Sequence, residues 1–432
     1  MGTTAIARGA LILALVIVSV LSSTPVFAET RKLALPQVVE ISLQNNGELK
    51  SFREEKGIRD AGKIRAGLLP NPTLELEGGT GALTGSSAEN SLSLGVSQEF
   101  ILAGKREKRL AVAESELEMY RWQLADRERV LRQEVQTAFY DVLLAEQRIA
   151  LAERSIGLNR QLLDVAKERL DAGDIPELEM NLVKVELARS EGARINVEGT
   201  LLQNQTKLWT LMGLSLGESP SIAGAFEAEI GMAKSLVDLK QLSHVKRPDL
   251  KALDAEKNRG ESDIALAQAE GIPNITAGIA LKRDTTSMDI GGIEGKDTAY
   301  TIGLRLSLPI PVFDKNQAGV QEARAKRIST ESRLLAAARN AEREVETAYA
   351  TLLNADKVLS LYKLNIIPQL EENLKLTQEA YRLGEVGILA VIQEQKKFFE
   401  VNDGYLSALH DHQTALVKLE SAVATELSGG VQ

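Results

Sequence analysis

Histidine is the residue type in this sequence best suited to acid–base or metal chemistry, and only three occur: His244, His410 and His412. His410 and His412 are two positions apart, a spacing that turns them to different faces of a helix. The chain contains no cysteine, so a tight zinc or copper site with nitrogen and sulfur ligands is not expected. His412 falls in an apolar heptad row, which favours a packing role. We therefore predict no metal site and no cofactor.

Other patterns that carry chemistry do not stand out either. We find no Ser/His/Asp constellation, no phosphate-binding glycine loop and no HExxH motif. The protein is therefore predicted not to be an enzyme. Its net charge of −9 has the wrong sign for nucleic acid, which calls for clustered positive charge, so no nucleic-acid partner is expected.

Long helices are the elements that position the polar residues. From Lys105 to Ala172 there is no proline, and apolar residues recur every seven positions in two interleaved rows, as in a coiled-coil seam. A continuous helix of this span would measure roughly 100 Å, whereas helices in globular domains average about 11–12 residues. Aromatic residues make up only 4% of the chain, which suits long helices better than a large globular core. The chain is then either a fibrous coiled coil or a protein that spans a wide gap.

The first 28 residues have the pattern of a secretory signal peptide. Arg8 precedes a short apolar run, and Val26-Phe27-Ala28 matches a cleavage signal, which makes Glu29 the expected mature N-terminus. The apolar run has about 11 residues, against about 20 for a helix that crosses a bilayer, and no later segment is long enough. A retained membrane anchor is the alternative. No cysteine lies near Glu29, so a lipid anchor is not expected.

The rest of the chain has the pattern of a tandem duplication. The turn at Gly173 corresponds to the turn at Gly384, and Gly157 corresponds to Pro368, which predicts a bend or a crossing point in both long helices. Each repeat contains short helices, a β-hairpin, a long helix and a return helix. The predicted parts are a signal peptide (1–28); repeat 1 (29–214), with a hairpin at about 72–99, a long helix at about 105–172 and a return helix at about 177–211; a connection (215–235); repeat 2 (236–427), with a hairpin at about 274–308, a long helix at about 315–383 and a return helix at about 388–427; and a tail (428–432).

The strands of both hairpins alternate apolar and polar residues, and a polar, glycine-containing loop joins the two strands of each. Four strands cannot close a barrel, which takes about eight, so several chains would have to pool their hairpins into one closed barrel in a membrane. An ordinary half-buried soluble hairpin is the alternative. The predicted lipid-facing residues are Leu74, Leu76, Leu92, Leu94, Ile279, Leu281, Leu304 and Leu306. The predicted barrel-lumen residues are Glu75, Glu77, Ser93, Ser97, Lys282 and Arg305.

Across its mature length the sequence resembles the trimeric outer-membrane efflux channels typified by TolC, and most closely the heavy-metal branch that works with cobalt–zinc–cadmium exporters. The resemblance rests on segments 66–72 and 104–106, on segment 308–317, and on the two turns at 171–174 and 382–387. It implies a mainly α fold with a small β part. Three chains, with four strands each, would form a 12-stranded transmembrane β-barrel joined to a long α-helical coiled-coil barrel.

The resemblance also implies that the two helical turns form a periplasmic tip that docks an adaptor protein. The residues that this places at the tip are Gly173, Asp174, Ile175, Gly384, Glu385, Val386, Gly387 and Ile388. In a trimer, Asp174 and Glu385 would form a ring of carboxylates that favours cations. Alternatively, these acids cap the helices that follow. Gln393, Glu394 and Gln395 occupy the region of the usual family gate aspartates, so that gate is not expected here.

The function implied by the resemblance is the outer-membrane channel of a tripartite efflux pump, a passive exit duct for heavy-metal cations. The implied partners are two further copies in a homotrimer, a periplasmic adaptor, an inner-membrane RND pump and outer-membrane lipid. The location would be the bacterial outer membrane, with a long periplasmic extension. The alternatives are a duct for organic drugs or type I secreted polypeptides and, from another class, a periplasmic coiled-coil adaptor or scaffold.

Overall fold

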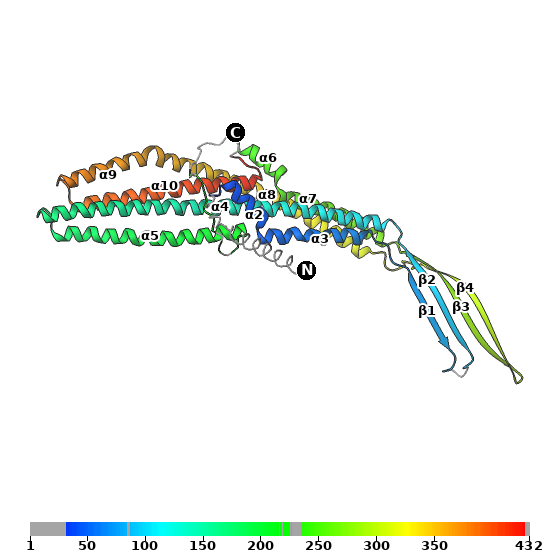
Figure 1. The fold of residues 1–432 in the computed structure, drawn as a ribbon. Helices are drawn as coiled ribbons and strands as arrows, with labels where there is room; N and C mark the ends of the chain where they lie inside the picture. Colours follow the sequence, from blue (N-terminus) through cyan, green and yellow to red (C-terminus); the bar gives the residue numbers. More distant parts are fainter. Residues whose placement is uncertain are drawn as a thin grey trace, which may run out of the picture.

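A computed structural model describes residues 32–83, 87–215, 217, 219–224, 226 and 235–427. The predicted signal peptide (1–28) and tail (428–432) lie outside these residues, as does part of the predicted connection at 215–235. The described chain is a long helical rod that carries a four-stranded sheet at one end (Figure 1). None of the helices in the described ranges combines the length and the apolar composition that a membrane crossing requires.

The elements follow the same order twice. The first series is α2 (Leu35–Asn45), α3 (Gly47–Gly67), β1 (Thr73–Thr80), β2 (Asn90–Phe100), α4 (Lys105–Asp171) and α5 (Glu177–Met212). The second series is α6 (Leu236–Lys246), α7 (Pro248–Glu270), β3 (Ile275–Ile290), β4 (Ile293–Ser307), α8 (Gln317–Leu361), the π-helix η1 (Tyr362–Ile366), α9 (Ile367–Arg382) and α10 (Ile388–Val423). The order of elements differs at one point: η1 interrupts the second long helix shortly before Pro368, whereas α4 runs through Gly157 without a break.

The ends of the long and return helices share one turn geometry. At the end of α4, Gly173 has φ +81°, and the Asp174 N–H donates to the carbonyl of Arg169. The end of α9 repeats this arrangement at Gly384, with φ +79°. This is a Schellman turn, which needs a left-handed residue and therefore favours glycine. The turn reverses the chain at the end of the rod farthest from the sheet (Figure 1).

The four strands form one antiparallel sheet in the order β1-β2-β3-β4. Leu94 pairs with Leu76 on one side and with Leu281 on the other, and Leu281 also pairs with Ile302, so these four side chains share a face. The strands β3 and β4 extend to Ile290 and Ile293, beyond the alternating segments predicted from the sequence. The edge strands β1 and β4 each leave one side of their backbone without a partner in the described chain.

Each repeat has its own apolar core where a short helix packs on the long helix and on the end of the return helix. In the first repeat, Val135 and Phe139 of α4 pack with Leu208 of α5. In the second, Val345 of α8 and Leu419 of α10 pack around Leu239 of α6. The aliphatic residues of the heptad rows thus supply the contacts that hold the rod together.

A buried arginine joins the second set of short helices to the rod. Arg247 is 4% exposed, makes a bidentate pair with Asp249 at 2.7 and 3.0 Å, and reaches Glu344 of α8 at 2.5 Å. Burial alone would lower the pKa of Arg247, but the hydrogen bonds that its guanidinium donates to the two carboxylates outweigh burial and raise the pKa. A buried charge that is fully paired in this way is costly to disturb.

Gly213→Ala tests the tight contact at the end of α5. Gly213 has φ +65°, and a Cβ there would overlap the carbonyl oxygen of Asn45. We expect the variant to lose about 1–3 kcal/mol of unfolding free energy, measured by thermal unfolding in detergent. The matched control is Gly199→Ala, where the Cβ enters open space in the same helix. An equal loss in both variants would contradict the contact.

Candidate functional site

The sheet register sorts the predicted lipid-facing and lumen residues onto opposite faces. The eight apolar residues, from Leu74 to Leu306, lie on one face and are exposed in the single chain. The six polar residues, from Glu75 to Arg305, lie on the other face. One face is therefore suited to an apolar surrounding and the other to water.

A network of charged and hydroxyl groups crosses the polar face. Arg305 on β4 donates to Glu75 on β1 at 2.5 Å, and the Ser97 hydroxyl on β2 donates to the same carboxylate at 2.8 Å. The strands β1 and β4 are the two edges, which in a flat sheet would stand about 14 Å apart. We infer that the polar face is concave, because its side chains bridge the two edges.

Small residues beneath this bridge fit a concave face. A Cβ at Gly278 would lie 3.0 Å from the Cβ of Ser97 and 3.1 Å from the carbonyl of Val96. Gly95 is nearly as confined, because a Cβ there would lie 3.1 Å from the Cβ of Ala280. The polar face thus has small residues where its surface is crowded, while Leu and Ile fill the opposite face.

The other end of the rod carries the two turns predicted as the tip. Gly173, Asp174, Gly384, Glu385 and Gly387 are exposed, and Val386 is half-buried. Leu178 and Leu389 hold equivalent positions in the two repeats and are 67% and 57% exposed. Two large apolar side chains at an exposed turn favour contact with another protein.

Two of the predicted tip residues are packed inside the chain. Ile175 and Ile388 are 7% and 2% exposed, in a cluster with Val183, Tyr381 and Val391. This cluster joins the hairpin α4–α5 to the hairpin α9–α10. The side chains of Ile175 and Ile388 therefore shape the turns and present little surface to a partner.

A clasp formed by Arg169 and Tyr381 links the two hairpins beside the turns. The Arg169 guanidinium donates to the backbone carbonyl of Tyr381 at 3.0 Å and lies over its ring, 4.8 Å from the centroid. Tyr381 is 1% exposed. Burial raises the pKa of its hydroxyl, the charge of Glu179 adds to this, and Arg169 opposes it. The tyrosine is thus neutral at physiological pH and packs as an apolar ring with a cation above it.

The two tip carboxylates are not helix caps. The N-caps of α5 and α10 are Pro176 and Gly387, and neither helix has a side-chain cap. Within the described part of the chain, the side chains of Asp174 and Glu385 make neither hydrogen bonds nor ion pairs. Both carboxylates therefore stand in solvent at the turn.

The structure separates the histidines. His410 Nε2 lies 2.9 Å from Asp141 of α4, and His412 Nε2 lies 2.7 Å from Asp356 of α8. Each histidine thus ties α10 to a different long helix. Among the residues that the structure covers, no three His, Cys, Asp or Glu side chains come together as metal ligands would.

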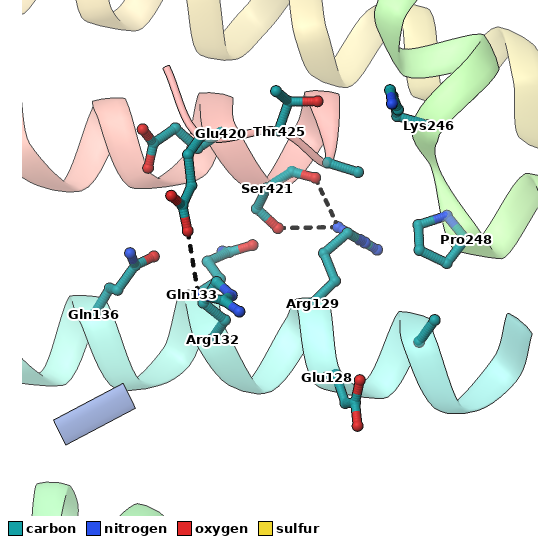
Figure 2. Close-up of a pocket in the computed structure, with 13 residues that line it drawn as sticks. Glu128, Arg129, Arg132, Gln133, Gln136, Lys246, Pro248, Glu420, Ser421 and Thr425 are labelled. Atoms are coloured by element: carbon teal, nitrogen blue, oxygen red, sulfur yellow. Dashed lines mark hydrogen bonds and ion pairs between the residues drawn. The ribbon is translucent and has the colours of Figure 1, made fainter. Parts of the chain in front are cut away.

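A groove of about 480 Å³ lies between α4, the end of α10 and the turn from α6 to α7 (Figure 2). Its arginines already have partners: Arg129 donates to the backbone carbonyl and the hydroxyl of Ser421 at 3.0 and 2.9 Å, and Arg132 pairs with Glu426 at 3.2 Å. These contacts join α4 of the first repeat to α10 of the second. The side chains that line the groove therefore connect the two repeats, and its arginines are engaged within the chain rather than available to a small charged ligand.

An amphipathic sheet on a long rod, with an exposed charged turn at the far end, describes a membrane-anchored transport component. The sequence matches the family described as outer membrane efflux protein over residues 39–214 and 239–425. The chain belongs to this family. It is accordingly an outer-membrane protein of an efflux system.

Individual relatives agree with this assignment. The chain is 24% identical over 394 residues to the cobalt-zinc-cadmium resistance protein CzcC of Cupriavidus metallidurans, covering 90% of each chain. It is 26% identical over 285 residues to the nickel-cobalt-cadmium resistance protein NccC of Alcaligenes xylosoxydans xylosoxydans, covering 64% of this chain and 60% of that one. The fold is similar to that of CusC, a protein that forms a transmembrane channel, with a TM-score of 0.73, 18% identity and coverage of 90% and 91%.

Sequence reasoning did not find the clasp. Arg169 is one of several basic residues near the end of the long helix, and nothing in its spacing marks it. One signal was available: where the first repeat has Leu170, the second has Tyr381 at the equivalent position before the turn glycine. An aromatic residue that occurs in only one of the two repeats indicates a contact that the other repeat does not make.

Gly384→Pro tests the role of the second turn. Proline fixes φ at about −65° and removes the Gly384 N–H that donates to the Tyr381 carbonyl. We therefore expect the folding free energy of the tip to fall by about 3 kcal/mol or more, with the rest of the chain unaffected. Export should fall, while the protein still reaches the outer-membrane fraction. The matched control is Gly387→Pro, because Gly387 has φ −82° and Pro176 holds the equivalent position in the first repeat. Loss of the Gly384→Pro protein from the membrane fraction would contradict the tip assignment.

Proposed function

We propose that this chain forms, as a homotrimer, the exit duct of a tripartite efflux pump that carries heavy-metal cations across the outer membrane. The observation that carries the proposal is the open sheet, with one apolar face, one polar face and two unpaired edges. In a bilayer each unpaired backbone group costs several kcal/mol, so β4 of one copy must pair with β1 of the next until the ring closes.

In this assembly, the apolar face from Leu74 to Leu306 contacts lipid, and the polar face from Glu75 to Arg305 lines a wet lumen. The concave shape of the polar face supports this orientation, because the inner wall of a barrel is its concave side. The Arg305–Glu75 pair on this wall neutralises part of its charge.

The tip is proposed as the controlled entrance and as the docking surface for a periplasmic adaptor. Exposed Leu178 and Leu389 supply apolar contact area, and the adjacent turns supply backbone at the surface. Three copies of Asp174 and Glu385 would surround the entrance with uncompensated negative charge, which raises the local concentration of cations. An inner-membrane RND pump would supply the energy, since the duct itself holds no nucleotide-binding motif.

Heavy-metal cations are proposed as the cargo because CzcC and NccC are named for resistance to cobalt, zinc, cadmium and nickel. The test is deletion of the gene, followed by growth on cobalt, zinc, cadmium, nickel and copper salts and on a panel of organic antibiotics. We expect about tenfold lower tolerance of one or more of the metals, restored by the intact gene, and unchanged tolerance of the antibiotics. Lower tolerance of the antibiotics alone would replace metals by organic compounds as cargo.

Arg169→Ala tests the clasp as a restraint on the tip. Removing a charge-assisted hydrogen bond and a cation–π contact weakens the link between the hairpins by about 1–3 kcal/mol. We expect about twofold higher single-channel conductance in planar bilayers, because the narrowest part of a pore limits its current. Arg382→Ala removes the same charge at the same end, from an exposed side chain outside the clasp, and should leave conductance unchanged. Equal effects of the two variants would point to surface charge instead.

A further inference from the structure

Between its sheet-side core and its turn glycine, the long helix of the second repeat contains one residue more than that of the first. Equivalent positions of the two repeats differ by 210 in residue number on the sheet side of the long helix and by 211 on the tip side. The pairs that show the first spacing are Val135/Val345, Val142/Leu352 and Ala145/Ala355, and those that show the second are Asn159/Leu370 and Gly173/Gly384. The extra residue therefore lies between Ala355 and Leu370.

The π-helix η1 lies in this interval and accommodates the extra residue. The N–H of Ile367 donates to the carbonyl of Tyr362, five residues earlier, which is the wider turn of a π-helix. The equivalent part of α4 is uninterrupted. Pro368 follows η1 and lacks the N–H that an α-helix would direct to the carbonyl of Leu364. The backbone hydrogen bonding of the helix is therefore weakened here by the proline as well as by the extra residue. Insertion and proline together make this the least regular part of the rod.

The helix opposite η1 is adapted to it at a single position. A Cβ at Gly404 of α10 would lie 2.5 Å from the hydroxyl oxygen of Tyr362 and 3.2 Å from its Cζ. Tyr362 can occupy this place only because residue 404 has no side chain. None of the five residues of η1 is buried. Both helices of the second hairpin thus have their most deformable point at the same level of the rod.

The two hairpins differ in shape accordingly. Figure 1 shows α4 and α5 running alongside each other without a break, whereas the chain around η1 arches away from α10 before α9 returns to the tip. Beyond the arch, Leu370 and Leu374 of α9 pack on Phe398 of α10, so the tip-side parts of both helices are joined to each other.

We propose that η1 and Gly404 form a hinge at which the tip-side part of the α9–α10 hairpin tilts against the rest of the rod. Tyr362 and Gly404 act as positioning residues, because the tyrosine seated on the glycine sets the resting angle. The first hairpin has no π-turn and is the fixed side. The inference rests on the proposed function, since tilting here matters only where the tip is the controlled entrance.

Deletion of Leu364 tests the hinge. This side chain is 72% exposed, and its removal makes the spacing from Ala355 to Leu370 equal to that from Ala145 to Asn159, which α4 spans as an unbroken helix. In the native background, Arg169→Ala should raise single-channel conductance about twofold. In the deletion background, the same substitution should produce no rise. An equal rise in both backgrounds would overturn the hinge, whereas no rise in the native background would count against the proposed tip function instead.

A second pair of variants keeps the test decisive if the deletion fails to fold. Gly404→Ala places a methyl group against the Tyr362 hydroxyl and should change the conductance of the native channel by about 1.5-fold or more. Adding Tyr362→Phe to the same chain removes the hydroxyl and should return the conductance to the native value. Gly192→Ala, in open space on α5, is the control and should have no effect. Unchanged conductance in Gly404→Ala, or no rescue by Tyr362→Phe, would overturn the proposal.

Discussion

The unpaired backbone edges of β1 and β4 are the constraint on which the rest of the structure depends. Water can satisfy such edges, but a bilayer cannot, so the sheet is incomplete in any membrane until further copies join it. The apolar and polar faces follow from the same requirement, since a closed wall needs one side for lipid and one for water. In the proposed ring of copies, the helical hairpins of the rod would be held around a common axis by the pairing of the strands.

The two repeats share one order of elements but differ at the clasp and at η1. Both have the same order of elements and the same Schellman turns, with glycine at φ +81° and +79°. The first half provides an unbroken helix and the cation of the clasp, Arg169. The second provides the ring that accepts it, Tyr381, and the π-turn. In the proposed hinge the first half is the stiff side and the second half is the side that adjusts, although both halves have the same order of elements.

Much of the fold was accessible from the sequence because its signals are periodic. Heptad rows over Lys105–Ala172 predicted the long helix, and alternation predicted which strand residues share a face. Alternation did not predict the full length of β3 and β4, because both faces of these strands become polar toward Ile290 and Ile293 and the sequence there has the pattern of a loop. The clasp was not predicted, because its hydrogen bond to the Tyr381 carbonyl leaves no mark in side-chain pattern and the change from Leu170 to Tyr381 does not identify Arg169 as the partner. The burial of Ile175 and Ile388 also depends on how two hairpins meet, which neither turn encodes alone.

The unequal lengths of the hairpins have a consequence for the outer surface of the cell. β3 and β4 have 16 and 15 residues, against 8 and 11 for β1 and β2, and they meet at Gly291-Gly292, both with positive φ. In a ring of copies, long and short β-hairpins would alternate, so the rim of the barrel would be uneven. The second repeat alone would then supply the outermost peaks, which are what phage, antibodies and neighbouring lipopolysaccharide would meet first.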